Sequence, residues 1–429
     1  MQNQTNKAGE KKFRKWLIIF SLVAAGELIF GLPFHLARFF RPAILGVFDL
    51  TNAELGDAIA VYGIIAMLSY FPGGLIADRF SARKLMSISL FATALGGVWL
   101  TTIPDKSMLS VLFGYWGATT ILLFWSALIR ATREWGGKYA QGRAFGFLDG
   151  GRGLVAAGAA SLGVVLFSSF LPADFENVSR ESRIEAFRVI IWFYTLLTFG
   201  GAVLVWIFIP DTEAEKLNPQ PFKGIKNVLR SSVTWLIAIV IITAYCGYKG
   251  LDFYGLYAMK IMDMNEVSAA RFVSNASYLR VIGAIGAGIL ADRISAKRTV
   301  FFTFALLIPV YLLLAFLTPG ASLLPVITGN LLFTFLSVYA LRGVYFALLE
   351  ESDVPKSITG TTVGVVSLLG FTPDVFFNSL AGRMLDATFG IAGFHHFFLL
   401  LTGFSAAGLG AVVMLMLQTG KRKSAAGNN

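Results

Sequence analysis

The chain has 429 residues, of which 56% are hydrophobic and only 14% are charged, and its mean hydropathy is +0.69. A water-soluble protein carries about 25% charged residues, so the composition excludes a soluble fold and predicts an integral membrane protein. The single cysteine, Cys246, lies inside an apolar run, which excludes a disulfide framework and a zinc site built from cysteines.

Twelve apolar runs follow one another along the chain, and each is long enough to cross a bilayer as a helix. Such unbroken runs do not fit the short alternating strands of a membrane barrel. We therefore predict an all-α membrane protein with spans at about residues 16–44, 54–78, 85–103, 109–130, 144–171, 187–210, 232–259, 267–291, 299–318, 322–349, 358–384 and 391–418. The first, fifth, seventh and eleventh runs contain Gly, Pro or charges, so these helices are expected to overshoot the hydrocarbon or to bend inside it.

The positions of lysine and arginine predict the orientation of the chain. With a cytoplasmic N-terminus, about 23 of these residues fall on the cytoplasmic side and about 9 on the other side, and cytoplasmic loops are the ones enriched in basic residues. We expect both termini in the cytoplasm of a multi-pass protein of the cell inner membrane. The net charge of +11 is scattered over short loops, so nucleic-acid binding is not expected.

Two loops repeat the same pattern of residues half a chain apart. Gly74-x3-Asp78-Arg79-x3-Arg83-Lys84 closes the second run, and Gly288-x3-Asp292-Arg293-x3-Lys297-Arg298 closes the eighth. The repeat predicts two six-helix bundles, residues 1–210 and 231–429, joined by a polar cytoplasmic linker at 211–230. Transporters built from such repeats bind their solute between the halves, near the midplane.

This repeated loop resembles the signature of the major facilitator superfamily, in which a Gly-x-x-x-Asp-Arg-x-Gly-Arg-Lys-type loop joins spans two and three and is echoed between spans eight and nine. Ser81 and Ser295 stand where the second glycine is usual. The resemblance implies the major facilitator fold, with twelve helices in two pseudo-symmetric bundles, and transport by alternating access. It also implies a cytoplasmic latch, although anchoring by positive charge is an alternative. The latch residues would be Gly74, Asp78, Arg79, Arg83, Asp292, Arg293 and Lys297.

A narrower resemblance runs to the organophosphate:phosphate antiporters of that superfamily and covers the first half best. It places the substrate-facing histidine of span five on Arg152 and the binding arginine of span one near Arg38. The second binding arginine falls on Gly247, with Lys249 two residues on; this departure argues against a phosphate substrate and leaves an anionic one open. The matching positions are Leu55-Gly56, Arg130-x4-Trp135-x6-Gly142, Tyr248 and Leu251-Asp252.

Charged residues inside the spans are the main functional signal, because each costs about 2.5–3.5 kcal/mol at mid-membrane on insertion scales and faces protein or water when it is kept. We predict that basic and aromatic residues on spans one, five, seven and ten bind the substrate: Arg38, Arg152, Lys249, Arg342, Tyr245 and Tyr248. Arg41, one turn after Arg38, is expected near the outer surface. The alternative for Asp149 with Arg152, Asp252 with Lys249, and Arg280 with Asp374 is a structural salt bridge.

Four carboxylates could couple protons or compensate the basic groups: Glu27, Asp149, Asp252 and Asp374. Glu27 is the first candidate, because burial of a lone carboxylate in an apolar helix favours its protonated form. An ion pair of Glu27 with Arg38 or Lys249 is the alternative. His35, His395 and His396 are expected at the outer interface, and Glu350, Glu351 and Asp353 at a solvated loop end.

Together these features predict a secondary transporter of a small organic anion in the lipid bilayer, coupled to protons or working by exchange. The resemblance to the superfamily implies that it works as a monomer. The alternatives are a transporter of this fold for a neutral sugar, a nucleoside or a cationic drug, and a transporter-like sensor. The sequence contains no phosphate-binding Gly-x4-Gly-Lys-Ser/Thr loop and no zinc-site spacing. We expect no enzyme activity, cofactor or metal.

Overall fold

The computed structural model describes residues 2–137, 141–171, 179–211, 225–352, 359–388 and 390–426. Within these ranges every regular element is a helix. Ten helices of the described part are long and apolar enough to cross a membrane, or eleven when the bent first span is counted as one. The predicted all-α membrane fold is confirmed.

The remaining predicted span, at about 85–103, coincides with α5 (Ala82–Leu100). This 19-residue helix carries Arg83 and Lys84 in its first turn. The two charges make α5 less apolar than the other spans, which explains why it falls outside that count.

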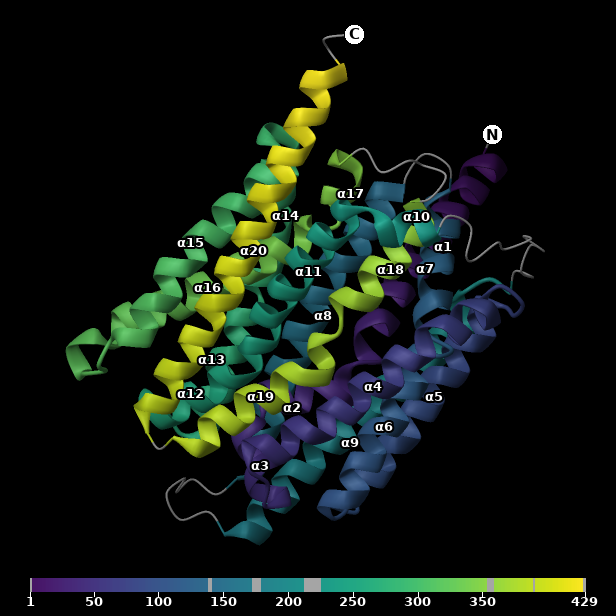
Figure 1. Cartoon of the computed structure of the whole chain (residues 1–429). Coiled ribbons are helices and arrows are strands. Elements are labelled where there is room, and N and C mark those ends of the chain that lie inside the picture. Colours follow the sequence, from purple (N-terminus) through teal and green to yellow (C-terminus); the bar gives the residue numbers. More distant parts are fainter. Residues whose placement is uncertain are drawn as a thin grey trace. The chain divides into compact units, whose positions relative to one another are not determined.

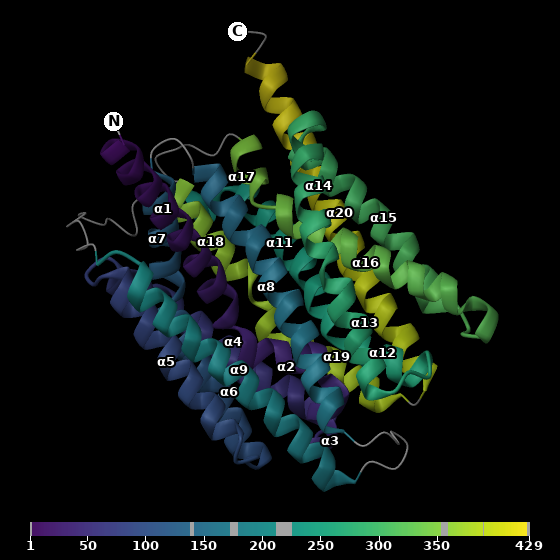
Figure 2. The same ribbon diagram turned by 180° about the vertical axis from the view of Figure 1, so that it is seen from behind.

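The chain forms two compact units, and the first holds Met1–Leu50, Val61–Leu217 and Asn265–Ser277. In this unit α1 packs against both α8 and α9, and α5 packs along α9 (Figures 1 and 2). Its elements are α1 (Gln2–Leu28), the π-helix η1 (Gly31–His35), α2 (Leu36–Phe39), α3 (Arg41–Phe48), most of α4 (Asn52–Ala77), α5, α6 (Lys106–Ile121), α7 (Trp125–Gly136), α8 (Gln141–Phe170), α9 (Arg180–Phe208) and α13 (Glu266–Ser277).

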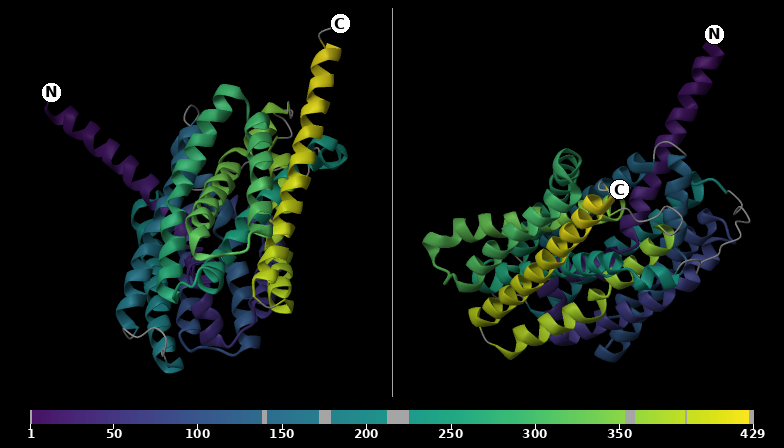
Figure 3. Two further views of the ribbon diagram at one scale, coloured as in Figure 1. Left: turned by 90° about the vertical axis from the view of Figure 1, so that its left-hand side faces the viewer. Right: turned by 45° about the horizontal axis from the view of Figure 1, so that its top comes forward.

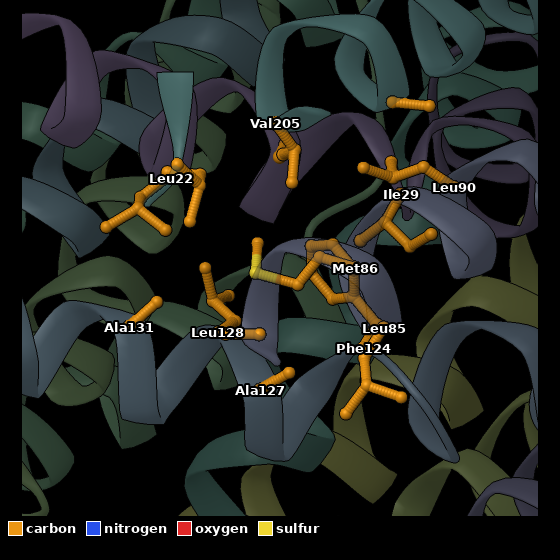
Figure 4. Close-up of a cluster of buried hydrophobic side chains, with 14 of the residues drawn as sticks. Leu22, Ile29, Leu85, Met86, Leu90, Phe124, Ala127, Leu128, Ala131 and Val205 are labelled. Atoms are coloured by element: carbon orange, nitrogen blue, oxygen red, sulfur yellow. The ribbon is translucent and has the colours of Figure 1, made fainter. Parts of the chain in front are cut away.

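A buried apolar cluster joins the helices of this unit (Figure 4). Leu22 of α1, Met86 of α5, Leu128 of α7 and Val205 of α9 belong to it. Because lipid is as apolar as leucine, close packing rather than exclusion of water holds such helices together. The cluster therefore fixes α1 against α7, and this position matters for the charged residues at the end of α1.

The second unit holds Thr51–Ala60, Asn218–Met264 and Tyr278–Asn429. Here α20 packs along α15 and α11, and α14 packs against α16; Figure 3 shows α20 as one uninterrupted helix. Its elements are α10 (Ile225–Arg230), α11 (Ser232–Gly250), the 3-10 helix η2 (Leu251–Phe253), α12 (Tyr254–Ile261), α14 (Leu279–Ile294), α15 (Ala296–Phe316), η3 (Ala321–Leu323), α16 (Leu324–Val344), α17 (Ala347–Glu351), α18 (Thr359–Gly370), α19 (Pro373–Ala387) and α20 (Ile391–Ala426).

The two compact units do not coincide with the two halves of the sequence, because two short segments are exchanged between them. The starts of these segments are as far apart in the sequence as the two repeated loops. The start of span two, Thr51–Ala60, packs in the second unit, and the start of span eight, Asn265–Ser277, packs in the first. Of the predicted linker at 211–230, residues 212–224 lie outside the described ranges and 225–230 form α10. The division into two six-helix bundles remains a prediction.

Hydrogen bonds account for the position of the start of α4. The Asp386 carboxylate of α19 accepts from the backbone amides of Asn52 at 3.2 Å and Ala53 at 2.7 Å. A carboxylate at these amides satisfies donors that the first turn of a helix leaves open, and it complements the helix dipole. Arg383 of α19 donates to the Asp57 carboxylate through its two terminal guanidinium nitrogens, at 2.8 and 3.0 Å. The start of span two is thus held by α19.

Of the four spans expected to overshoot or bend because of Gly, Pro or charges, spans one, seven and eleven are interrupted in their middle, whereas span five runs unbroken as α8. Span one bends by 44° between residues 13–28 and 31–39, where the π-helix η1 contains Pro33, which has no amide hydrogen to donate. Span seven passes through η2, and in span eleven α18 ends at Gly370 before α19 begins at Pro373. The interruptions lie beside the buried charges of the same spans.

Candidate functional site

Span one and span five meet at a group of three charged or titratable residues, which we call the first cluster: Glu27, His35 and Arg152. One Glu27 oxygen accepts a hydrogen bond from Arg152 Nε at 2.9 Å, and the other lies 3.2 Å from His35 Nε2. Glu27 and His35 are 3% and 4% exposed. Eight residues of straight helix rise about 12 Å, so the bend and π-turn of span one help to bring the two side chains together.

Glycines and aromatic rings position Arg152. A Cβ at Gly151 would lie 2.6 Å from Val23 Cγ1, so only glycine lets α8 approach α1 this closely. The guanidinium lies over the rings of Phe30 and Trp125, at 5.6 and 5.8 Å from their centroids. Cation–π contacts of this kind stabilise a guanidinium away from water. Arg152 is therefore held by a carboxylate and by two ring faces.

The structure corrects two sequence predictions in this region. His35 was expected at the outer interface, but it is buried and bonded to Glu27. Arg41 was expected near the surface, but its side chain is fully buried. Both predictions rested on closeness to the outer end of span one, and that position does not show which neighbouring helices cover the two side chains. Arg38 is buried as well, and Asp149, one turn before Arg152 on α8, is half-buried.

Span seven and span eleven form the second cluster: Lys249, Asp252, Asp374 and Tyr245. Lys249 Nζ lies 2.8 Å from Asp374 Oδ1 and 3.6 Å from Asp252 Oδ2. The Tyr245 hydroxyl donates to Asp374 Oδ2 at 3.1 Å. Lys249 is 1% exposed, so this cation is shared between two buried carboxylates. The salt bridge foreseen between Lys249 and Asp252 is present, and Asp374 is the closer partner.

Arg342 of α16 lies beside the second cluster. Its guanidinium carbon is 3.9 Å from the Tyr248 ring centroid and 5.8 Å from that of Tyr245, and these two rings stack at 5.6 Å. Arg342 and Tyr248 are half-buried. Stacking uses the face of a guanidinium, whereas its N–H groups point outward in the plane and suit a carboxylate or phosphate. Arg280, at the start of α14, is also buried.

Spans one and five of the first half correspond to spans seven and eleven of the second half, and the two clusters place their cation and carboxylate on these spans in reverse order. In the first, span one carries the carboxylate and span five the cation; in the second, span seven carries the lysine and span eleven the nearer carboxylate. His35 and Lys249 are separated by the same offset as the repeated loops. Equivalent positions of the two halves therefore both carry a basic side chain at the break of the span.

The first signature loop is tied to the end of span six. Arg83 Nη2 lies 2.5 Å and Lys84 Nζ 3.8 Å from Asp211 Oδ2. The Ser81 hydroxyl and these two cations favour the ionised carboxyl, so they hold the pKa of Asp211 below its ordinary value. Asp78 and Arg79 are exposed, and a Cβ at Gly74 would meet open space.

The second signature loop is capped by Glu351. Its carboxylate accepts from the backbone amides of Ala296 at 2.6 Å and Lys297 at 3.0 Å, at the first turn of α15. Lys297 Nζ donates to the Glu351 carbonyl at 2.7 Å, whereas Asp292 and Arg293 are exposed. The prediction that Glu351 is simply solvated is wrong, because the helix start supplies amide donors that the sequence pattern does not reveal. The latch role itself remains a prediction.

Long apolar helices, repeated loops and charged pairs buried beside helix breaks define the class of solute transporter built from internal repeats. The family model of the Major Facilitator Superfamily matches residues 16–377, and the chain belongs to this superfamily. Its fold and family are therefore those of transporters, and alternating access is their mechanism.

Two of the relatives span nearly the whole chain, and a third spans about two thirds of it. Inner membrane proteins YihN and YqcE of Escherichia coli (strain K12) are each 28% identical, over 96% and 94% of this chain and 97% and 95% of their own. A probable nitrate/nitrite antiporter, NarK1 of Thermus thermophilus, is 22% identical over 68% of this chain and 64% of its own.

Two solved structures share the fold. One is a bacterial homolog of the human lysosomal transporter Spinster, inward-facing and unoccupied, with a TM-score of 0.68, 15% identity, and coverage of 95% of this chain and 96% of that chain. The other is a mutant of the nucleoside transporter NupG, with a TM-score of 0.67, 14% identity, and coverage of 94% and 99%.

Proposed function

We propose that this protein is a secondary active transporter that carries a small organic anion across the inner membrane, coupled to protons or by exchange. The observation that carries the proposal is the pairing of buried cations with nearby carboxylates at the breaks of spans one, seven and eleven. A buried ion pair often stabilises a fold no better than apolar residues of the same volume, so stability alone gives little reason to keep two of them.

An anion can replace a carboxylate as the partner of a buried guanidinium, so the guanidinium keeps a negative partner. At Arg152, a carboxylate of the solute would take the position that Glu27 occupies in the structure. Glu27 would pair with Arg152 again when the solute leaves, so the cation never stays buried without compensation. Glu27, Asp149, Asp252 and Asp374 would share this compensating or proton-coupling role.

In the second unit, Arg342 is better placed than Lys249 to contact a solute. Lys249 is deeply buried and held by two carboxylates, whereas Arg342 is half-buried and stacked on Tyr248. We propose Arg342 with Tyr245 and Tyr248 as direct contacts and Lys249 as the group that orients Asp374. Arg38, buried beyond the bend of span one, would add positive potential for an anion.

The relatives agree with an anionic substrate, since one of them is named as a probable antiporter of nitrate and nitrite. The likeness to the nucleoside transporter rests on 14% identity and concerns the fold. A neutral solute is therefore one outcome of the test rather than a second proposal.

A thermal-shift screen of the purified protein against anionic, neutral and cationic metabolites tests the proposal. A ligand at about 100 times its dissociation constant stabilises its protein by about 2.7 kcal/mol. Only anions should stabilise the wild-type protein, and Arg152→Gln and Arg342→Gln should each lose the effect. The control is Lys260→Gln, which removes an exposed cation of α12. Equal stabilisation of all four proteins by a neutral or cationic compound would refute the anion assignment.

A further inference from the structure

His35 shares its carboxylate partner with Arg152. The two oxygens of Glu27 face different bases, His35 Nε2 at 3.2 Å and Arg152 Nε at 2.9 Å. Arginine is charged at every physiological pH, whereas histidine is the side chain whose charge ordinarily changes between pH 5 and 8. One buried carboxylate thus connects a permanent cation with a proton-binding group.

The helices that pack on η1 determine which other charges His35 experiences. These helices are α1, α2, α5, α8 and α9. They bring Glu27, Arg38, Arg152 and the phenol of Tyr194, whose ring lies 5.6 Å from the His35 ring and nearly perpendicular to it. Between residues 85 and 100, α5 contains no ionisable side chain.

Charged side chains of the neighbouring helices also contribute to the balance of positive and negative charge around His35. Arg41 on α3 adds a cation, and the half-buried Asp149 on α8 adds a carboxylate. The groups named so far are three guanidinium groups, of Arg38, Arg41 and Arg152, and two carboxylates, of Glu27 and Asp149. Without an added anion, protonating His35 would increase an existing excess of positive charge.

We propose that His35 is the proton-binding residue of the transport cycle and that Glu27 links it to the anion site on Arg152. This inference rests on the proposed function, because it assumes that the solute anion binds Arg152. The anion displaces Glu27 from Arg152, and Glu27 then pairs with the protonated imidazole. Nε2 keeps its hydrogen and donates it to Glu27, and the incoming proton, taken from water, is carried by Nδ1.

Charge balance makes the two binding events depend on each other. An anion that binds alone adds one negative charge to a buried region, and a proton that binds alone adds one positive charge; both are costly away from water. Binding together leaves the net charge unchanged. The anion therefore favours the proton and the proton favours the anion by the same factor, and one of each is carried per cycle.

Nuclear magnetic resonance of 15N-histidine-labelled full-length protein in lipid nanodiscs tests the link without any solute. The chain has three histidines, and His35→Gln identifies the signal of His35. At pH 7, Arg152→Gln should increase the protonated fraction of His35, because Glu27 loses its competing cation. Glu27→Gln should decrease it, because the imidazole then faces Arg152 without the intervening carboxylate. We expect these two variants to differ at least tenfold in the ratio of protonated to neutral ring.

The signals of His395 and His396 serve as internal controls and should not change in either variant. If His35→Gln does not fold, His395→Gln and His396→Gln assign the remaining signals and leave that of His35 by difference. An unchanged His35 signal in both variants, or changes in the reverse order, would overturn the link. That result would leave the thermal-shift test of anion binding untouched, so the failure of one proposal is distinguishable from the failure of the other.

Discussion

The buried cations Lys249 and Arg152 differ in the number of carboxylates that they contact. Lys249 faces two carboxylates, Asp252 and Asp374, whereas Arg152 is bonded to Glu27. In the second cluster one lysine therefore compensates two carboxylates. Removing the lysine leaves both carboxylates without their cation, whereas removing one carboxylate leaves the lysine paired with the other. This asymmetry yields a prediction that depends on residue charge rather than on side-chain size.

Lys249→Met should destabilise the protein by about 3–5 kcal/mol, the cost of leaving buried charges without their partner. Asp374→Asn should cost clearly less, because Asp252 still faces the lysine and the Tyr245 hydroxyl can donate to the new amide oxygen. Chemical unfolding in detergent, followed for both variants and the wild type, measures the difference. Equal losses for the two variants would show that the charge count does not govern this cluster.

The sequence identifies the charged residues of the site but not their partners. Glu27, Arg152, Lys249 and Asp374 stand out because each interrupts an apolar run. The partner of Glu27 lies 125 residues away on another helix, and no local pattern encodes that contact. The burial of His35 was missed because its place toward the outer end of span one does not show which helices cover it. The Gly31-Leu32-Pro33 sequence just before it marks the break in the helix.

At the scale of helices, the contact between α4 and α19 depends on glycine. A Cβ at Gly56 would lie 2.5 Å from the backbone oxygen of Asn378, and a Cβ at Gly382 would overlap the backbone oxygen of Asn52. Both obstacles are main-chain atoms, so rotation of a side chain cannot relieve them. Gly56 of α4 thus faces the backbone of α19, and Gly382 of α19 faces the backbone of α4.

Gly56→Ala and Gly382→Ala should each destabilise the protein by about 1–3 kcal/mol, the usual cost of overpacking a well-packed contact. Gly286→Ala on α14 is the matched control, since a Cβ there would meet nothing within 4 Å. In a helix, alanine is favoured over glycine by roughly 0.5–1 kcal/mol, so the control should be neutral or slightly stabilising. Thermal unfolding of the three variants distinguishes these effects, and a loss in the control equal to the others would contradict the close-approach explanation.

The tie between Asp211 and Arg83 predicts a pH dependence at the first signature loop. Because the pKa of Asp211 is lowered in the folded protein, its contribution to stability is present above the ordinary carboxyl pKa and is lost as pH falls through the lowered value. Asp211→Asn should therefore be less stable than the wild type at pH 7, and the difference should shrink as the pH falls below the ordinary carboxyl pKa of 3.8. Thermal unfolding of both proteins across this range provides the measurement. A difference that grows with acidity would contradict the tie.

The sequence predicts where the helices lie along the chain, but it does not predict that the starts of spans two and eight pack in the unit formed mainly by the other half. Hydropathy alone locates the spans, and Gly or Pro marks the breaks in spans one and eleven. Thr51–Ala60 belongs to the second unit because it contacts α19. The bonded residues are far apart in the sequence: Asp57 and Arg383 by 326 positions, and Asn52 and Asp386 by 334. Such contacts follow from tertiary packing, and the repeat by itself predicts only that segments at equivalent positions of the two halves should behave alike, as they do.

For the whole molecule, family membership establishes a transporter, and the buried clusters suggest what it carries. Each unit places a guanidinium against aromatic rings, Arg152 against Phe30 and Trp125 and Arg342 against Tyr248. Each unit also keeps a carboxylate bonded to a buried cation. The proposed anionic solute would use both features, since it would take the place of the carboxylate as the partner of the guanidinium and keep that cation compensated.

Solute uptake by reconstituted vesicles tests this account most directly. Wild-type, Arg152→Gln and Lys260→Gln proteins in liposomes would be given the same mixture of anionic, neutral and cationic metabolites, and the washed vesicles analysed by mass spectrometry. We predict that wild-type and Lys260→Gln vesicles take up one or more organic anions faster than protein-free vesicles, and that Arg152→Gln vesicles do not. Uptake confined to neutral or cationic solutes, and equal in all three proteins, would contradict the account.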